Sequence, residues 1–221
     1  MKYPLRIPLS ILMTNKEPQV KREKDLKGVT LGEARGEKVI YEVYRDVEPV
    51  QHYDLRADVT VLRPCLLSGG EFCRTHGHVH PEGPWEAPWP EVYVVLKGSG
   101  KFLLHDEKRA YLVEVKEGDV VRVPEGMAHV LINDSDEALV TLNFVSKSVK
   151  PDYEWVRERG GPALFLTPEG PVKNEAYELE EVKLCRPLSV TLDSLVIAHS
   201  VKPSLEEWLV CFPYKLGKAR P

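Results

Sequence analysis

The chain has 221 residues, of which 43% are hydrophobic and 29% charged, and this excludes a disordered tail, a collagen-like repeat and a disulfide-dense miniprotein. Thirty basic and 34 acidic residues give a formal net charge of −4, so no domain-wide positive field could hold nucleic acid or an anionic membrane. We therefore expect neither nucleic acid nor membrane as a partner, and an anionic ligand would have to be captured locally.

We expect no export signal in the N-terminal segment, because Pro4 and Pro8 interrupt the apolar stretch around residues 7–13 and no small-residue cleavage site follows. No later stretch approaches the roughly 20 apolar residues of a membrane-spanning helix. The four cysteines are scattered along the chain: Cys65, Cys73, Cys185 and Cys211. Without a CxxC pair they suit neither a structural zinc site nor a secreted disulfide framework, which predicts a reducing, cytoplasmic location.

Short stretches rich in valine, isoleucine, leucine and aromatic residues, punctuated by 18 prolines and 15 glycines, predict a mainly β fold. The expected strands are residues 38–44, 58–63, 72–80, 91–96, 101–105, 110–115, 120–123, 129–132 and 138–145. Turn signals separate them, at residues 97–100, 106–108, 117–119, 124–126 and 133–136. Short strands at this spacing are typical of a sandwich or barrel, and a jelly roll is one way in which such sheets limit their exposed edges.

Two segments depart from this pattern. Residues 81–90 contain four prolines and two tryptophans, so we expect a stiff, irregular loop between two strands. In the tail after residue 166, apolar runs such as 190–197 are candidates for further strands. There Ser204-Leu205-Glu206-Glu207 has the form of a capping box, which predicts a short helix through Cys211.

Three histidines alternate within one expected strand. His76, His78 and His80 would project from the same face of that strand. Imidazole is a common ligand of iron, zinc, nickel and manganese, and a metal would explain why three such rings share a face. From this run alone, histidines satisfied at the surface or in the core remain the alternative.

A second pattern, G-x5-P-x-G-x2-H-x3-N, is made by Gly118, Pro124, Gly126, His129 and Asn133. It is the complete second motif of the cupin superfamily. The first motif is present in parts, as a His-x-His pair and as Glu91 with Gly98 after a gap of six residues. The chain therefore resembles a cupin, which implies a mainly β jelly-roll barrel holding one metal with three histidines and a glutamate.

On this resemblance the expected metal ligands are His78, His80, Glu91 and His129. His76 and His78 have the same spacing as the favoured histidine pair, and Glu82 follows His78 at the shorter spacing of the superfamily. We favour Glu91 because it begins a strongly predicted strand, whereas Glu82 lies among prolines and a glycine, and strand residues hold ligands more firmly. His76 is then expected beside the metal or facing the substrate.

Longer blocks are similar to the archaeal cupin-type phosphoglucose isomerases, colinear over about residues 20–166: 39–44, 60–62, 75–80, 91–100 and 123–129. The blocks TxGHxH and EVYVxLKGxG are more specific than the general cupin motifs. The resemblance implies a cytoplasmic homodimer that interconverts glucose 6-phosphate and fructose 6-phosphate. It also implies one divalent metal per subunit, with Fe(II) as the first expectation and Mn, Ni, Zn or Co as alternatives.

Carried over by position, three residues would bind the phosphate: Thr60, Thr75 and the backbone at Gly77. Glu91 and Tyr93 would face the sugar, with Glu91 as the base that moves a proton between C1 and C2 through an enediol. A metal-assisted hydride shift is the alternative, because a carboxylate held tightly by a cation is a weak base. Arg63 and Arg74 could add positive charge near the phosphate, with a solvated strand residue as the alternative for each.

Three positions differ from the family pattern. Gly126 stands where the family has a tyrosine, Val145 stands at a phosphate-side tyrosine, and Pro151 stands at a histidine beside the active site. The substrate shell is therefore partly rebuilt. A different metal-dependent sugar isomerase or epimerase, a dioxygenase and a non-catalytic sugar-binding cupin stay open as alternatives.

The resemblance also divides the chain into three parts. Residues 1–36 are expected to form an N-terminal extension with extra strands that packs on the barrel or swaps between two barrels. Residues 37–166 would form the cupin barrel, and residues 167–221 a C-terminal extension.

Overall fold

The computed structural model describes residues 16–47, 55–80, 91–188, 205 and 208–216. The expected loop at 81–90, the expected strand at 190–197 and most of the expected capping box lie outside these residues. Within the described part of the chain, no helix is long and apolar enough to cross a membrane.

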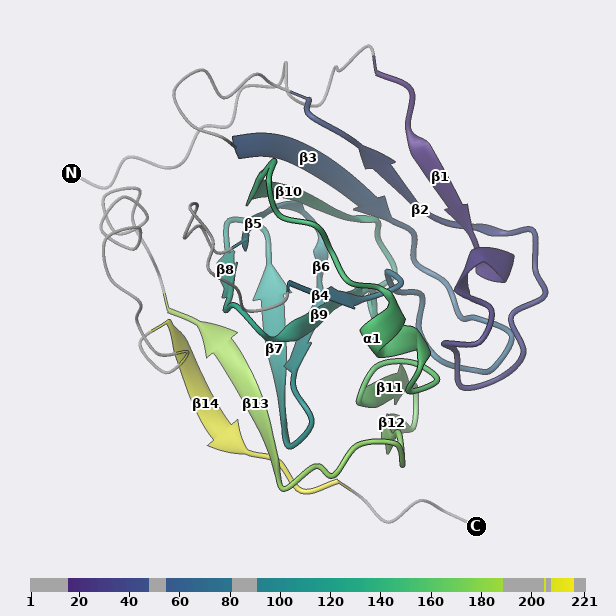
Figure 1. The fold of residues 1–221 in the computed structure, drawn as a ribbon, viewed down its shortest axis with the longest axis vertical. Coiled ribbons are helices and arrows are strands. Elements are labelled where there is room, and N and C mark those ends of the chain that lie inside the picture. Colours follow the sequence, from purple (N-terminus) through teal and green to yellow (C-terminus); the bar gives the residue numbers. More distant parts are fainter. Residues whose placement is uncertain (1–15, 48–54, 81–90, 189–204, 206–207, 217–221) are drawn as a thin grey trace.

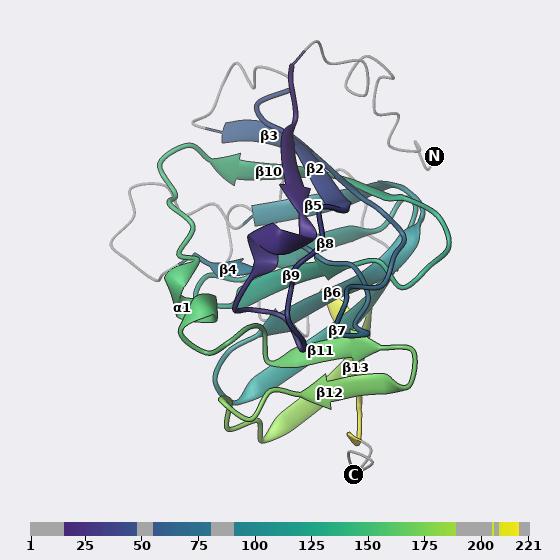
Figure 2. The same cartoon turned by 90° about the vertical axis from the view of Figure 1, so that its right-hand side faces the viewer.

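Two six-stranded sheets face one another around a common interior (Figures 1 and 2). The first sheet has the order β1 (Gln19–Arg22), β2 (Val39–Tyr44), β3 (Leu55–Leu62), β10 (Leu139–Ser146), β5 (Glu91–Lys97) and β8 (Val120–Val123). The second has the order β14 (Leu209–Pro213), β13 (Glu181–Pro187), β7 (Arg109–Lys116), β6 (Ser99–His105), β9 (Ala128–Ile132) and β4 (His78–Val79). The expected mainly β jelly-roll barrel is confirmed.

Three smaller elements complete the fold. A 3-10 helix, η2 (Glu23–Leu26), follows β1 directly. After β10 come the single α-helical turn α1 (Glu154–Arg157) and a hairpin of β11 (Leu164–Thr167) and β12 (Gly170–Lys173).

The main hydrophobic core lies between the two sheets. It includes Val43 and Tyr93 from the first sheet and Phe102, Val113 and Leu131 from the second. The strands turn alternate side chains toward this core, as the sequence period of two predicts.

Residues 72–80, which contain His76, His78 and His80, do not form the continuous strand expected from the sequence. Only β4 is a regular strand there, and Arg74 makes an isolated bridge to Ile132 of β9. Gly77 interrupts the strand with φ of +84°, and a Cβ on it would lie 2.7 Å from Cγ2 of Val130. This backbone conformation is one that glycine adopts readily, and it removes His76 from the regular alternation of the strand.

The C-terminal strands extend the second sheet. β13 pairs with β7 in parallel, and β14 pairs with β13 in antiparallel, so the second sheet grows beyond the expected barrel. The expected helix through Cys211 is wrong, because Leu209 already begins β14. Pairing with β13 across the sheet overrides the local capping signal.

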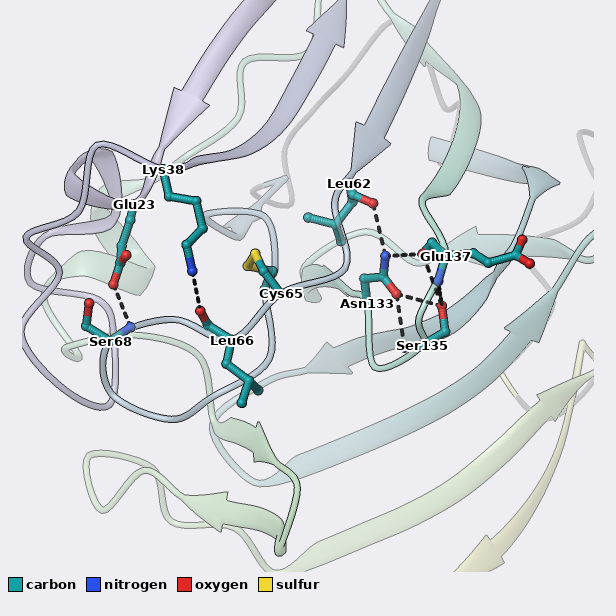
Figure 3. Close-up of a disulfide and its surroundings, with 10 residues drawn as sticks. Glu23, Lys38, Leu62, Cys65, Leu66, Ser68, Asn133, Ser135 and Glu137 are labelled. Carbon is teal, nitrogen blue, oxygen red and sulfur yellow. Dashed lines mark hydrogen bonds between the residues drawn. A yellow bond between two sulfur atoms is a disulfide. The ribbon is translucent and has the colours of Figure 1, made fainter.

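All four cysteines form disulfides, Cys65–Cys73 and Cys185–Cys211, so the expectation of no disulfide framework is wrong. Their sequence separations of 8 and 26 residues form no recognisable spacing, and the pairs meet only because the chain folds back on itself. Figure 3 shows how the loop after Cys65 is held: the Lys38 ammonium donates to the carbonyl of Leu66 at 2.9 Å. The backbone N–H of Ser68 donates to the Glu23 carboxylate at 2.6 Å.

Candidate active site

The structure brings all of the expected site residues to one pocket between the two sheets. Its lining includes the eight residues expected from the sequence: Thr60, Thr75, Gly77, His78, His80, Glu91, Tyr93 and His129. They come from β3, the segment around β4, β5 and β9, so both sheets contribute.

Glu91 lies at the centre of the histidines. Its Oε2 atom lies 3.0 Å from Nε2 of His129, 3.6 Å from Nε2 of His80 and 3.9 Å from Nε2 of His78. The Nε2 atoms of His78 and His80 are 3.0 Å apart. The ladder between β4 and β9 places His78 directly opposite His129, which explains how residues so distant in sequence share one cluster.

The two oxygens of Glu91 have different surroundings. Oε1 accepts a hydrogen bond of 2.6 Å from the side-chain amide of Asn143. Oε2 is buried and, among the described residues, accepts no hydrogen bond of acceptable geometry. A buried carboxylate oxygen that faces three ring nitrogens is costly without a cation or shared protons. The donor set of imidazoles and one carboxylate therefore fits a divalent cation.

The protonation of the cluster supports the same fit. Burial lowers the pKa of His80 to about 4 and that of His78 well below its usual value, so both rings are neutral and each can offer a lone pair at neutral pH. Burial would raise the pKa of Glu91, but the electrostatic effect of His129 opposes this and the pKa is lowered, so the carboxylate is ionised. His78, His80 and Glu91 hold their potential ligand atoms within 4.8 Å of one another.

His76 does not join this group. Its Nδ1 atom contacts the carbonyl of Gly77 at 3.0 Å, and its ring stands edge-on to Tyr153 with centroids 5.3 Å apart. It lines the pocket without approaching Glu91, in keeping with the preference for the pair His78 and His80.

Tyr93 lies directly beside the cluster. Its hydroxyl is 3.3 Å from Nε2 of His129, and burial raises its pKa well above the usual value. The phenol therefore keeps its proton and can donate a hydrogen bond.

The expected phosphate residues also reach the pocket. The hydroxyl oxygen of Thr75 accepts from the backbone N–H of Leu131 at 3.0 Å, which leaves its own proton available to a ligand. Thr60 lies opposite Val43 in the ladder of β2 and β3, and both residues line the pocket.

The sequence did not identify the arginines that line the pocket. Arg63 is exposed and pairs with Glu42, while Arg74 is buried and donates to Glu71 at 2.9 Å; neither lines the pocket. Arg45 and Arg56 line it instead. The period of two along β3 could have revealed Arg56, because it lies four residues before Thr60 and so shares its face.

Other lining residues were also missed or were known only as differences from the family pattern. Tyr41, Asn143 and Tyr153 line the pocket and carry no motif of their own. Val145 and Pro151, two of the positions that differ from the family pattern, line it as well. Two of the three differences therefore lie inside the site, and Gly126 is not part of the pocket lining.

The two-sheet barrel, with three histidines and a glutamate gathered between its sheets, is that of a cupin-type protein. Residues 16–180 match the family model described as glucose-6-phosphate isomerase, and the chain belongs to this family. This membership confirms the expected enzyme class. The matched region ends just before β13, so β13 and β14 lie beyond it.

Curated relatives agree with this assignment. The glucose-6-phosphate isomerase of Thermococcus litoralis is 32% identical over 169 residues, covering 73% of this chain and 86% of the relative. That of Thermococcus onnurineus is 35% identical over 161 residues, covering 70% of this chain and 82% of the relative.

The sequence identities to solved structures are lower than those to the curated relatives. The polyketide cyclase RemF from Streptomyces resistomycificus has a TM-score of 0.41 and 17% identity, covering 62% of this chain and 78% of RemF. A Cupin 2 conserved barrel domain protein from Salinispora arenicola has a TM-score of 0.35 and 17% identity, covering 49% of this chain and 76% of that protein. The family assignment rests on the sequence matches alone.

Proposed function

We propose that this protein is a metal-dependent aldose–ketose isomerase that interconverts glucose 6-phosphate and fructose 6-phosphate. The observation that carries the proposal is the buried Oε2 atom of Glu91, which faces three imidazole nitrogens in a pocket lined by every expected site residue. Family membership supplies the substrate class.

In this proposal His78, His80, Glu91 and His129 hold one divalent cation per subunit, with Fe(II) as the first candidate and Mn, Ni, Zn or Co as alternatives. When bound, the cation would polarise the carbonyl oxygen of the open-chain sugar. Because the imidazoles are neutral, they do not reduce the positive charge of the cation. The Tyr93 hydroxyl keeps its proton and can donate a hydrogen bond to a sugar oxygen beside it.

Hydrogen transfer between C2 and C1 has two possible routes at this site. In the first, the Glu91 carboxylate removes the C2 proton and returns it to C1 of the enediol. The lowered pKa of Glu91 and the Asn143 hydrogen bond on Oε1 both weaken this base. These features favour the second route, a hydride shift from C2 to C1 in which the proton of the C2 hydroxyl moves to the C1 oxygen. Turnover in deuterated water distinguishes the two, because only the first incorporates solvent deuterium at C1.

The test of the proposal is NMR detection of fructose 6-phosphate formed from glucose 6-phosphate by protein reconstituted with Fe(II) or Mn(II). We expect wild-type protein to form product and His78→Ala to lose both metal and activity. His76→Ala is the matched comparison, and elemental analysis should show that it keeps its metal. A folded, metal-loaded wild type that forms no product would contradict the proposal.

A different metal-dependent sugar isomerase or epimerase is the second candidate, because Val145 and Pro151 change the lining of the pocket itself. Turnover of another sugar, with none of glucose 6-phosphate, would select it. Stabilisation by sugars without any turnover would instead indicate a non-catalytic sugar-binding cupin.

We also propose that the protein works as a cytoplasmic homodimer, on the basis of the resemblance to the archaeal isomerases alone, because the two disulfides remove the argument for a reducing location that the scattered cysteines gave. Light scattering should give twice the chain mass of 25.1 kDa. A monomeric mass at working concentration would contradict this assembly.

A further inference from the structure

Two arginines line the pocket on the side of the first sheet, and they share one buried partner. Oδ2 of Asp58 accepts from Nη1 of Arg45 at 2.7 Å and from Nε of Arg56 at 3.0 Å. The other Asp58 oxygen accepts from the backbone N–H of Asp46 at 2.8 Å. The Asp58 side chain is 0% exposed, whereas those of Arg45 and Arg56 are 37% and 27% exposed. A fixed carboxylate thus aligns two arginines that solvent and ligand can reach.

The strand register explains why these arginines enter the pocket. Arg56, Asp58 and Thr60 alternate on β3, so their side chains share a face. In the ladder of β3 and β10, Asp58 lies opposite Asn143 and Arg56 lies opposite Val145. Directly opposite residues project from the same face, and both Arg56 and Val145 line the pocket.

The charges of this group favour an anion. Two guanidinium groups and one carboxylate leave one net positive charge, and the lining of the pocket contains no other lysine or arginine among the described residues. Arg56 is bonded to Asp58 through Nε, so its terminal nitrogens can present a fork of donors. Such a fork matches two oxygens of a phosphate.

The position of the arginines relative to Glu91 also fits a phosphosugar. Strand β10 separates β3 from β5, so the backbones of Arg56 and Glu91 lie two strand spacings apart, about 10 Å. A six-carbon sugar phosphate has its carbonyl at one end and its phosphate at the other. Arg45 and Arg56 line the same pocket as His78 and His80, so both ends of the substrate would lie in one cavity.

We infer that Arg45 and Arg56, aligned by Asp58, form the clamp that binds the phosphate group of the substrate. The clamp works together with Thr60, Thr75 and the backbone at Gly77, and it supplies the positive charge that these neutral groups lack. This inference rests on the proposed function for the identity of the sugar. It assigns phosphate specificity to two residues outside the motifs.

The experiment compares Arg45→Gln, Arg56→Gln and the conservative Arg45→Lys and Arg56→Lys variants in the metal-loaded enzyme. Steady-state kinetics give KM and kcat for glucose 6-phosphate, and inorganic phosphate serves as a competing inhibitor. We expect each glutamine variant to raise KM and the inhibition constant of phosphate by about 10–100-fold, because a hydrogen bond to a charged group is lost. The KM and phosphate inhibition constants of the lysine variants should lie between those of the wild type and those of the glutamine variants. The kcat of all four variants should stay within about threefold of the wild-type value.

The matched control is Arg63→Gln, which removes an exposed arginine paired with Glu42 at 3.3 Å, outside the pocket. Its KM and phosphate inhibition should equal those of the wild type. Thermal melts show whether the loss of a partner for buried Asp58 unfolds the glutamine variants. The lysine variants keep a charge beside Asp58 and test the clamp if the glutamine variants do not fold.

The outcomes separate this inference from the proposed function. Turnover of glucose 6-phosphate with unchanged KM and phosphate inhibition in all folded variants would overturn the clamp and leave the isomerase proposal standing. Lower melting temperatures with unchanged phosphate inhibition would likewise assign the arginines a merely structural role and overturn the clamp. If the wild type does not turn over glucose 6-phosphate, calorimetric binding of inorganic phosphate tests the clamp alone. Weaker phosphate binding by the variants than by the wild type would then support the clamp. Equal phosphate binding by the variants and the wild type, or no phosphate binding by the wild type, would overturn it.

Discussion

Single residues of the second cupin motif have separate physical roles in this chain. The Asn133 amide donates to the carbonyls of Leu62 at 3.0 Å and Glu137 at 2.7 Å, and its oxygen accepts from the backbone of Ser135. Gly126 has φ of +74°, a backbone conformation that favours glycine. Only His129 of this motif reaches the cluster. Most residues of the motif are therefore those that the turns require, and His129 is the one that belongs to the candidate metal site.

A buried histidine outside the site makes stability depend on pH. His105 lies against the rings of Trp155 and Tyr177, and burial lowers its pKa to about 3. The unfolded chain takes up this proton near pH 6.5, so stability present above pH 6.5 is lost as the pH falls toward 3. The full effect of this one group is about 5 kcal/mol.

The check is urea unfolding of wild type, His105→Phe and His105→Gln at several pH values between 7 and 3. The wild-type free energy of unfolding should fall more steeply with acid than that of either variant. His78 and His80 titrate in all three proteins, so the difference in slope isolates His105. Equal slopes would mean that His105 does not hold its neutral form through burial.

At the level of elements, the sequence predicts the strands better than it predicts what joins them. The expected strands at 91–96, 101–105, 110–115, 120–123, 129–132 and 138–145 correspond to β5 through β10, because each buries alternate side chains in one core. The disulfides and the pairing of β13 with β7 depend on contacts between distant parts of the chain. The alignment of Arg56 with Val145 depends on the register of two strands, which no local pattern contains.

The two disulfides should have different effects on function. Cys65–Cys73 closes the segment that leads directly to Thr75 and the histidines, whereas Cys185–Cys211 joins β13 to β14 at the far edge of the second sheet. Each constrains the unfolded chain and should contribute about 2–4 kcal/mol to stability.

We expect the Cys65→Ala/Cys73→Ala variant to lose stability and to bind metal more weakly, because the segment carrying Thr75 and His78 is less firmly held. The Cys185→Ala/Cys211→Ala variant serves as its matched control and should lose stability alone. Denaturant unfolding measures the stability of both variants, and metal titration measures their metal affinity. Equal metal affinity in the two variants would show that the first disulfide does not position the site.

For the whole molecule, the proposed metal site is a link between the two sheets. Glu91 belongs to β5 of the first sheet, and His78 and His129 belong to β4 and β9 of the second. A cation held by all of them would bind the folded chain and not the unfolded one, because unfolding separates the ligands. At 100–1,000 times the dissociation constant, such binding adds about 3–4 kcal/mol to the free energy of unfolding.

Removing the metal should therefore lower the melting temperature of the whole chain in one cooperative transition, since both sheets share one core. The measurement is calorimetry of metal-loaded protein before and after treatment with EDTA, with metal release followed by elemental analysis. His78→Ala is the control, and its melting temperature should respond to neither metal nor chelator. If the wild type releases its metal and melts at the same temperature, the cation does not connect the sheets, and Glu91 must satisfy its buried oxygen through protons shared with the histidines instead.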